Sequence, residues 1–132
     1  MINSCAKAIT PTRRCDSATE QLFTLHWLPV KKRAEYKGRI ICHKIAHGVE
    51  FTPQYFNDVI GVHKPVRFTR SSEAILLRSD FRAQFVYAGE RSIDHFLPKL
   101  WNSLPLDLRN ESNFTAFKRK LKTYLFQQHF YR

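Results

Sequence analysis

The chain has 132 residues, and its 22 lysines and arginines outnumber its 11 aspartates and glutamates, which gives a formal net charge of +11. This length fits one domain with a modest core, and a hydrophobic content of 43% argues against an intrinsically disordered chain. The positive charge predicts a polyanionic partner, with nucleic acid first and an anionic membrane surface second. The alternative is a lysine-rich, solvated surface without a special partner.

Three cysteines, Cys5, Cys15 and Cys42, cannot all pair within one chain. Residues 1–10 are too few and too polar for the apolar part of a secretory signal, and no apolar run approaches the ~20 residues of a membrane span. We therefore expect an intracellular protein, nuclear or cytoplasmic, in a reducing compartment and without a membrane partner.

Two short helices are expected at the start of the chain. Residues 1–10 fit the first, since a proline follows them. Ser17 caps the second, and Glu20, three residues later, completes a capping box. We expect residues 1–24 to pack more loosely than the rest of a single domain that covers residues 1–132.

A long helix is expected within residues 25–48. Pro29 suits its first position, where the missing N–H would have no partner, and Gly48 suits the position after its last turn. Apolar residues recur at helical spacing and predict a buried stripe formed by Val30, Ala34, Gly38, Ile41 and Ile45. Basic residues crowd the first half of this helix at Lys31, Lys32, Arg33, Lys37 and Arg39.

Residues 52–61 fit a further helix, with Thr52 as its cap and Pro53 at its first position. Residues 62–72 are expected to form a basic loop. Its arginines are Arg67 and Arg70.

Two β-prone runs follow, at residues 74–77 and 84–87. They predict either a hairpin or two extended pieces that lie over helices. Residues 92–104 then fit a helix, in which Pro98 favours a kink or a second start.

The last helix, within residues 112–129, carries apolar side chains at helical spacing and basic side chains beside them. Its basic residues are Lys118, Arg119, Lys120 and Lys122. Across the whole chain, the side chains expected to anchor the core are Trp27, Ile41, Ile45, Trp101, Phe117 and Leu121. The expected fold class is mainly α, a small single helical domain with at most one short β-hairpin.

The two basic helices carry the main functional signal. If they pack side by side, their positive faces form one groove that follows the phosphates of a nucleic acid, and Arg67 and Arg70 add a basic loop. Such binding tolerates any base sequence and weakens strongly with salt. Two ordinary solvated helix faces are the alternative. Trp27 and Trp101 are able to stack on unpaired bases, although their apolar neighbours favour the core.

Four sequence blocks lie in order along nearly the whole chain. The first is Leu25-His-Trp-Leu-Pro-Val30, followed by Arg33, Tyr36 and Lys37. The second is Lys44-Ile-Ala-His-Gly48 with Thr52-Pro-Gln-Tyr55, and the third is Arg67-Phe-Thr-Arg-Ser-Ser72. The fourth runs from Gly89-Glu-Arg91 through Pro98-Lys-Leu-Trp-Asn-Ser-Leu-Pro105 and Arg109 to residues 117–126. Together they resemble the C-terminal region of reverse transcriptase polyproteins from non-LTR (LINE-type, jockey-like) retrotransposons. The resemblance implies a segment downstream of the palm and thumb of an RNA-directed DNA polymerase.

No catalytic chemistry is expected of this chain. A polymerase of that family holds two metal ions with clustered carboxylates, as in a Tyr-x-Asp-Asp turn, and this chain has no adjacent aspartates. It also lacks a Walker loop, a nucleophile elbow and an H-E-x-x-H zinc helix. Cys42, His43 and His47 have metal-ligand character, but no close pair such as C-x₂-C accompanies them. We expect no catalytic residue, metal, cofactor or small-molecule substrate.

The sequence therefore predicts a non-catalytic nucleic-acid-binding module that contacts RNA template or target DNA through its basic helix faces. The polymerase segment of the same polyprotein is a further expected partner. The alternatives are a structural platform for the polymerase thumb and a degenerate retroelement fragment without function.

Overall fold

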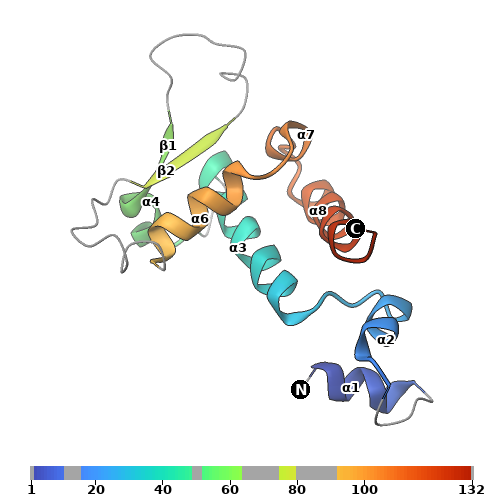
Figure 1. Cartoon of the computed structure of the whole chain (residues 1–132). Helices are drawn as coiled ribbons and strands as arrows, with labels where there is room; N and C mark the ends of the chain where they lie inside the picture. Colours follow the sequence, from blue (N-terminus) through green and yellow to red (C-terminus); the bar gives the residue numbers. More distant parts are fainter. Residues whose placement is uncertain (1, 11–15, 49–51, 64–74, 80–91, 132) are drawn as a thin grey trace.

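The structure, a computed structural model, describes residues 2–10, 16–48, 52–63, 75–79 and 92–131. In chain order the elements are α1 (Ile2–Ile9), α2 (Ala18–Thr24), α3 (Val30–His47), α4 (Gln54–Val59), β1 (Ile60–His63), β2 (Leu76–Ser79), α6 (Ile93–Asn102), α7 (Leu106–Arg109) and α8 (Phe114–Phe130). This mainly helical arrangement with one two-stranded antiparallel sheet confirms the expected fold class. Helix α3 runs through the middle of the molecule, α6 crosses it, and α8 packs beside it (Figure 1).

Helix α3 ends where Gly48 predicts and begins one residue later than expected. Pro29 stands one position earlier than expected, as the N-cap, and Gly48 follows the helix with the left-handed angles φ 61° and ψ 34°. The expected apolar stripe is wrong in the first half of the helix, where Val30 and Ala34 are exposed. The reason is that α6 packs on α3 at Gly38, about two turns beyond Val30. The buried residues of α3 are Gly38, Arg39, Cys42, His43 and Ile45.

Helices α3 and α6 approach each other closely at Gly38. A Cβ at this position would lie 2.9 Å from Leu100 Cδ2, so a larger side chain meets packed methyl groups. One residue later, the buried guanidinium of Arg39 donates from Nε to the Leu100 carbonyl at 3.3 Å and from Nη1 to Glu35 Oε2 at 3.2 Å. Arg39 thereby ties α3 to the last turn of α6, where carbonyls have no partner within the helix.

The sheet pairs β1 with β2 in antiparallel register, with Ile60 opposite Ser79. The second half of the first β-prone run, residues 74–77, lies in β2. Its partner in the structure is β1, which the sequence assigns to a helix end and a loop. Residues 60–63 form a strand instead, because the chain becomes extended at Ile60, directly after α4, and the side chain of Ile60 is buried, with 2% of its surface exposed. The second run, residues 84–87, lies outside the described residues.

Helix α6 holds the sheet through its last two residues. Trp101 Nε1 donates to the Ile75 carbonyl at 2.9 Å. The Asn102 amide donates to the Leu77 carbonyl at 2.9 Å and accepts from the Leu77 N–H at 3.1 Å. These two bonds occupy backbone groups on the edge of β2 that faces away from β1. The helix is continuous, with Pro98 buried inside it.

The main core lies where α3, α6 and α8 meet. Ile45 is buried in it, and Ile41 is half-buried against it. Trp27 departs from expectation, because it is half-buried and lies outside this cluster, in the connection between α2 and α3. Asn113 begins α8, since its side-chain oxygen accepts from two backbone N–H groups of the first turn. The large side chains that are fully buried in this core include Trp101, Phe117, Leu121 and Leu125.

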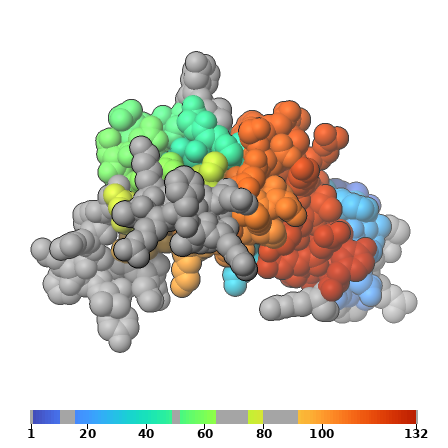
Figure 2. Space-filling model, turned by 90° about the horizontal axis from the view of Figure 1, so that it is seen from above, coloured from blue at the N-terminus to red at the C-terminus, as the bar shows by residue number. Residues whose placement is uncertain are grey.

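The N-terminal helices α1 and α2 pack on each other, and α2 also contacts the end of α8. Ser17 caps α2, although its hydroxyl accepts from the N–H of Thr19 rather than that of Glu20. Phe23 connects α2 to α8, with its ring centre 5.6 Å from that of Phe126. Figure 2 shows the α1–α2 pair (blue) beside α8 (red), with α4 (green) at the opposite end of the molecule. In the described part of the chain, no helix is both long and apolar enough to span a membrane.

Candidate nucleic-acid interface

A groove opens between α3, α8 and the connection that joins α2 to α3. Three of its side chains, Arg33, Lys37 and Lys122, belong to the cations that the sequence predicts to bind nucleic acid. The hollow has a volume of about 620 Å³. It is lined by His26, Trp27, Leu28, Arg33, Tyr36, Lys37 and Lys122. We call this site the α3–α8 groove.

A second hollow, of about 370 Å³, continues the groove along α8. It shares His26 and Lys122 with the first hollow and extends to Phe126 and Tyr131. The basic side chains therefore lie next to a row of aromatic ones.

The connection between α2 and α3 builds the aromatic wall of the groove. His26 adopts a φ of 53°, a left-handed angle that costs a non-glycine residue about 1–2 kcal/mol. Its ring stacks on that of Phe126, with 5.3 Å between the ring centres and 7° between the planes. The N–H of Trp27 donates to the Leu22 carbonyl at 2.8 Å, which anchors the next residue to α2. The left-handed turn thus places His26 against α8 and Trp27 in the wall of the groove.

Two further lysines extend the basic side of the groove. Lys44 follows Lys37 by seven residues on α3, and Lys118 precedes Lys122 by four residues on α8, so each shares a helix side with its neighbour. The Nζ atoms of Lys44 and Lys118 lie 5.6 Å and 4.6 Å from the centre of the Phe114 ring. The two rows of positive charge therefore meet at this ring.

The cations of the groove have no carboxylate partner among the described residues. Arg33, Lys37 and Lys122 take part in no ion pair there. The ion pairs that these parts of the chain do form are Lys32–Glu35, Arg39–Glu35 and Lys120–Glu111. A positive groove without internal counter-charge raises the local concentration of anions.

The other expected cations of α3 lie outside the groove. Lys32 Nζ donates to Glu35 Oε2 at 3.1 Å and to Gln128 Oε1 at 2.8 Å, so it already links α3 to α8. Lys31 is exposed and does not line the groove. The expected loop residues Arg67 and Arg70 lie outside the described residues.

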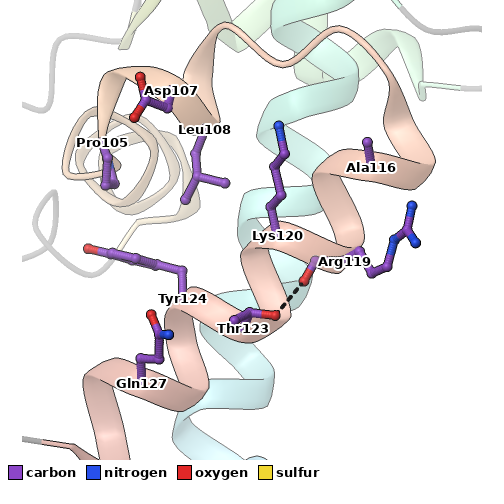
Figure 3. Close-up of a pocket in the computed structure, with 9 residues that line it drawn as sticks. All are labelled: Pro105, Asp107, Leu108, Ala116, Arg119, Lys120, Thr123, Tyr124 and Gln127. Atoms are coloured by element: carbon purple, nitrogen blue, oxygen red, sulfur yellow. Dashed lines mark hydrogen bonds between the residues drawn. The ribbon is translucent and has the colours of Figure 1, made fainter.

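Arg119 and Lys120 line a separate hollow of about 480 Å³ between α7 and α8, where Figure 3 shows them pointing in different directions. Asp107 lines the same hollow from α7, and Lys120 is paired with Glu111. The expectation that all basic residues of α8 form one face is therefore wrong. Lys120 and Lys122 are two residues apart, which separates them by about 200° around the helix.

The side chains with metal-ligand character have other partners. Cys42 Sγ donates to the Leu97 carbonyl at 3.3 Å, and burial raises the pKa of Cys42 to about 12. His43 donates from Nε2 to the Glu111 carbonyl in the α7–α8 connection at 2.7 Å. His47 donates from Nε2 to the carbonyl of Arg109, the last residue of α7, at 3.2 Å. The two histidines therefore fasten the end of α7 and the α7–α8 connection to α3. Among the described residues, no three His, Cys, Asp or Glu side chains gather in a way that could hold a metal ion.

Sequence reasoning missed part of the groove. The sequence favours a core position for Trp27, with base stacking as the alternative, and it includes His26 and Tyr36 in a block of the family resemblance without predicting them as groove residues. Helical spacing could have predicted two more residues at the groove, because Tyr36 follows Arg33 by one helical turn and Lys44 lies on the same side of α3 as Lys37. The position of His26 depends on its backbone angle, for which the sequence gives no comparable signal.

Comparison of the chain with protein-family models, curated proteins and solved structures found no match. The resemblance to LINE-type reverse transcriptases therefore stays a prediction.

Proposed function

We propose that this chain is a non-catalytic nucleic-acid-binding module that holds a sugar–phosphate backbone in the α3–α8 groove. One observation carries the proposal: Arg33, Lys37 and Lys122 converge there from two helices, without a carboxylate partner among the described residues. The resemblance to the region downstream of a LINE-type polymerase agrees with this role, and it makes RNA template or target DNA the natural ligand.

Phosphate contacts of this kind predict a definite salt dependence. Each phosphate neutralised on a single strand contributes about −0.7 to the slope of log affinity against log salt concentration. If Arg33, Lys37, Lys44, Lys118 and Lys122 all contact phosphates, single-strand affinity falls about a hundredfold between about 50 and 200 mM salt.

Titration of labelled single-stranded RNA and duplex DNA at these two salt concentrations tests the proposal. The groove variant carries Arg33→Gln, Lys37→Gln and Lys122→Gln. We expect it to bind weakly and to lose only about sevenfold affinity over the same range, since two of the five contacts remain.

A matched control removes the same number of charges outside the groove. It carries Lys31→Gln, Lys99→Gln and Arg119→Gln, all at exposed positions. We expect its salt slope to stay close to that of the parent chain. If both variants lost affinity equally, binding would depend on net charge and not on the groove. If the parent chain bound neither ligand at low salt, the proposed function would be wrong.

A further inference from the structure

The α3–α8 groove has more aromatic surface than phosphate binding requires. Trp27 and Tyr36 line its first hollow, Phe126 and Tyr131 line its second, and His26 lines both. Phosphates are recognised by positive charge and hydrogen-bond donors, whereas flat rings recognise the faces of bases. The alternation of cations and rings therefore indicates a ligand with exposed bases.

The two tryptophans of the chain have different environments. Trp101 is fully buried, and its Nε1 donates to the Ile75 carbonyl, so it has a complete structural role. Trp27 is half-buried outside the main core and shares one hollow with Arg33 and Lys37. A ring at the wall of a positive groove suits a stacking platform for a base whose phosphates lie on the neighbouring cations.

Size and shape favour a single strand over a duplex. The first hollow, about 620 Å³, falls within the range of pockets that enclose small organic ligands, so it has room for a nucleotide. In a duplex the bases are paired and stacked on each other, so only the phosphates and groove edges are available. An unpaired strand offers both parts of the nucleotide at once.

We propose that the α3–α8 groove selects single-stranded nucleic acid and that an unpaired base stacks on Trp27. The second hollow, where His26 and Phe126 already stack on each other, then receives the sugar and phosphate of the neighbouring nucleotide. This inference rests on the proposed function, because the phosphates of the strand must first bind the cations of the groove.

The test compares two single strands that carry the same number of phosphates. One is oligothymidylate of about eight nucleotides, and the other is an abasic oligomer of equal length, which has the backbone without bases. We expect the parent chain to bind oligothymidylate about tenfold more tightly than the abasic strand. Oligothymidylate, but not the abasic strand, should also quench the fluorescence of Trp27, whereas buried Trp101 gives a constant background.

Variants assign this preference to one ring. Trp27→Leu should lower affinity for oligothymidylate to that for the abasic strand and leave abasic binding unchanged, and Trp27→Phe should restore most of the preference. Tyr55→Leu is the matched control, because Tyr55 is 58% exposed on α4 and does not line the groove. The quenching measurement requires no variant, so it still tests the inference if Trp27→Leu does not fold.

The outcomes separate the two proposals. Equal binding of the two strands by the parent chain, without quenching, would overturn the stacking inference while the phosphate-binding function stands. Binding of neither strand at low salt would overturn the proposed function itself. A preference for oligothymidylate that survives in Trp27→Leu would show that Trp27 is not the platform, which also overturns the inference.

Discussion

His43 is a titratable side chain held in the core. Its ring stacks on Phe117, with 4.2 Å between the ring centres, and Nε2 donates to the Glu111 carbonyl. Within the described residues, Nδ1 has no hydrogen-bond partner. Burial lowers the pKa of His43 below its ordinary value of 6.5, which outweighs the hydrogen bond to Glu111 that raises it. The neighbouring His47 lowers this pKa further.

We expect His43→Gln to flatten the acid side of the stability curve. In the parent chain, the unfolded state takes up a proton near pH 6.5 and the folded state only at lower pH. The free energy of unfolding therefore falls as pH drops below about 6.5, by up to about 1.4 kcal/mol per pH unit. Glutamine still offers a donor to the Glu111 carbonyl but does not titrate.

Urea unfolding between about pH 5 and 8 measures this slope. His129→Gln, on the exposed side of α8, removes a histidine without touching the core and serves as the control. Identical slopes for the parent chain and His43→Gln would show that the buried ring does not control the acid response.

At the scale of the helices, the crossing of α3 and α6 depends on the missing side chain of Gly38. We expect Gly38→Val to lower the free energy of unfolding by about 1–2 kcal/mol. The added methyl groups crowd Leu97 and Leu100, at a cost of about 1–3 kcal/mol, while the higher helix propensity of valine returns about 0.4 kcal/mol.

Ala34→Val is the matched control, because Ala34 lies one turn earlier on the same side of α3 but at an exposed position. It should cost only the propensity difference, about 0.6 kcal/mol. Chemical unfolding midpoints of the two variants measure the contrast. A Gly38→Val chain as stable as Ala34→Val would mean that the two helices do not touch closely at this point.

Elements with local signals were predictable, and those with distant partners were not. The expected range of helix α8, residues 112–129, lies within two residues of its observed ends, because its apolar residues repeat at helical spacing. Strand β1 was missed because a strand of four residues has no period of its own. Residues 60–63 form a strand because they pair with β2, and the other edge of β2 is held by hydrogen bonds from Asn102 of α6.

The candidate groove was predictable to a similar extent. The sequence indicated which cations belong to α3 and α8, and Arg33, Lys37 and Lys122 do meet. The sequence could not indicate that Lys120 lies on the side of α8 that faces α7. Helical spacing gives the direction of a side chain around its own helix, but not which other element lies on that side. Counting basic residues therefore overestimates the area of the positive surface.

For the molecule as a whole, the net charge of +11 acts on stability in two opposite ways. Without a polyanion, the positive charges repel each other in the compact state, and salt relieves this repulsion by screening. With a bound oligonucleotide, salt instead removes the stabilisation that binding provides. The sign of the salt effect should therefore depend on the ligand.

We expect the Tm of the free chain to rise by a few degrees between about 10 and 100 mM salt. With oligothymidylate at about a hundred times its Kd, binding adds about 2.7 kcal/mol at low salt, or about 8–10 °C, and Tm should fall as salt is added. Thermal unfolding followed by circular dichroism measures all four conditions.

The variant with Arg33→Gln, Lys37→Gln and Lys122→Gln separates the two effects within one molecule. Without ligand it should be more stable than the parent chain at low salt, because three mutually repelling charges have been removed. Adding oligothymidylate should hardly change the Tm of this variant, because it lacks the three charges that are proposed to bind the phosphates. If its Tm rose with oligothymidylate as much as that of the parent chain, the ligand would bind elsewhere on this basic surface. Both results together would show that these three charges destabilise the free protein by repulsion and provide the affinity for the oligonucleotide.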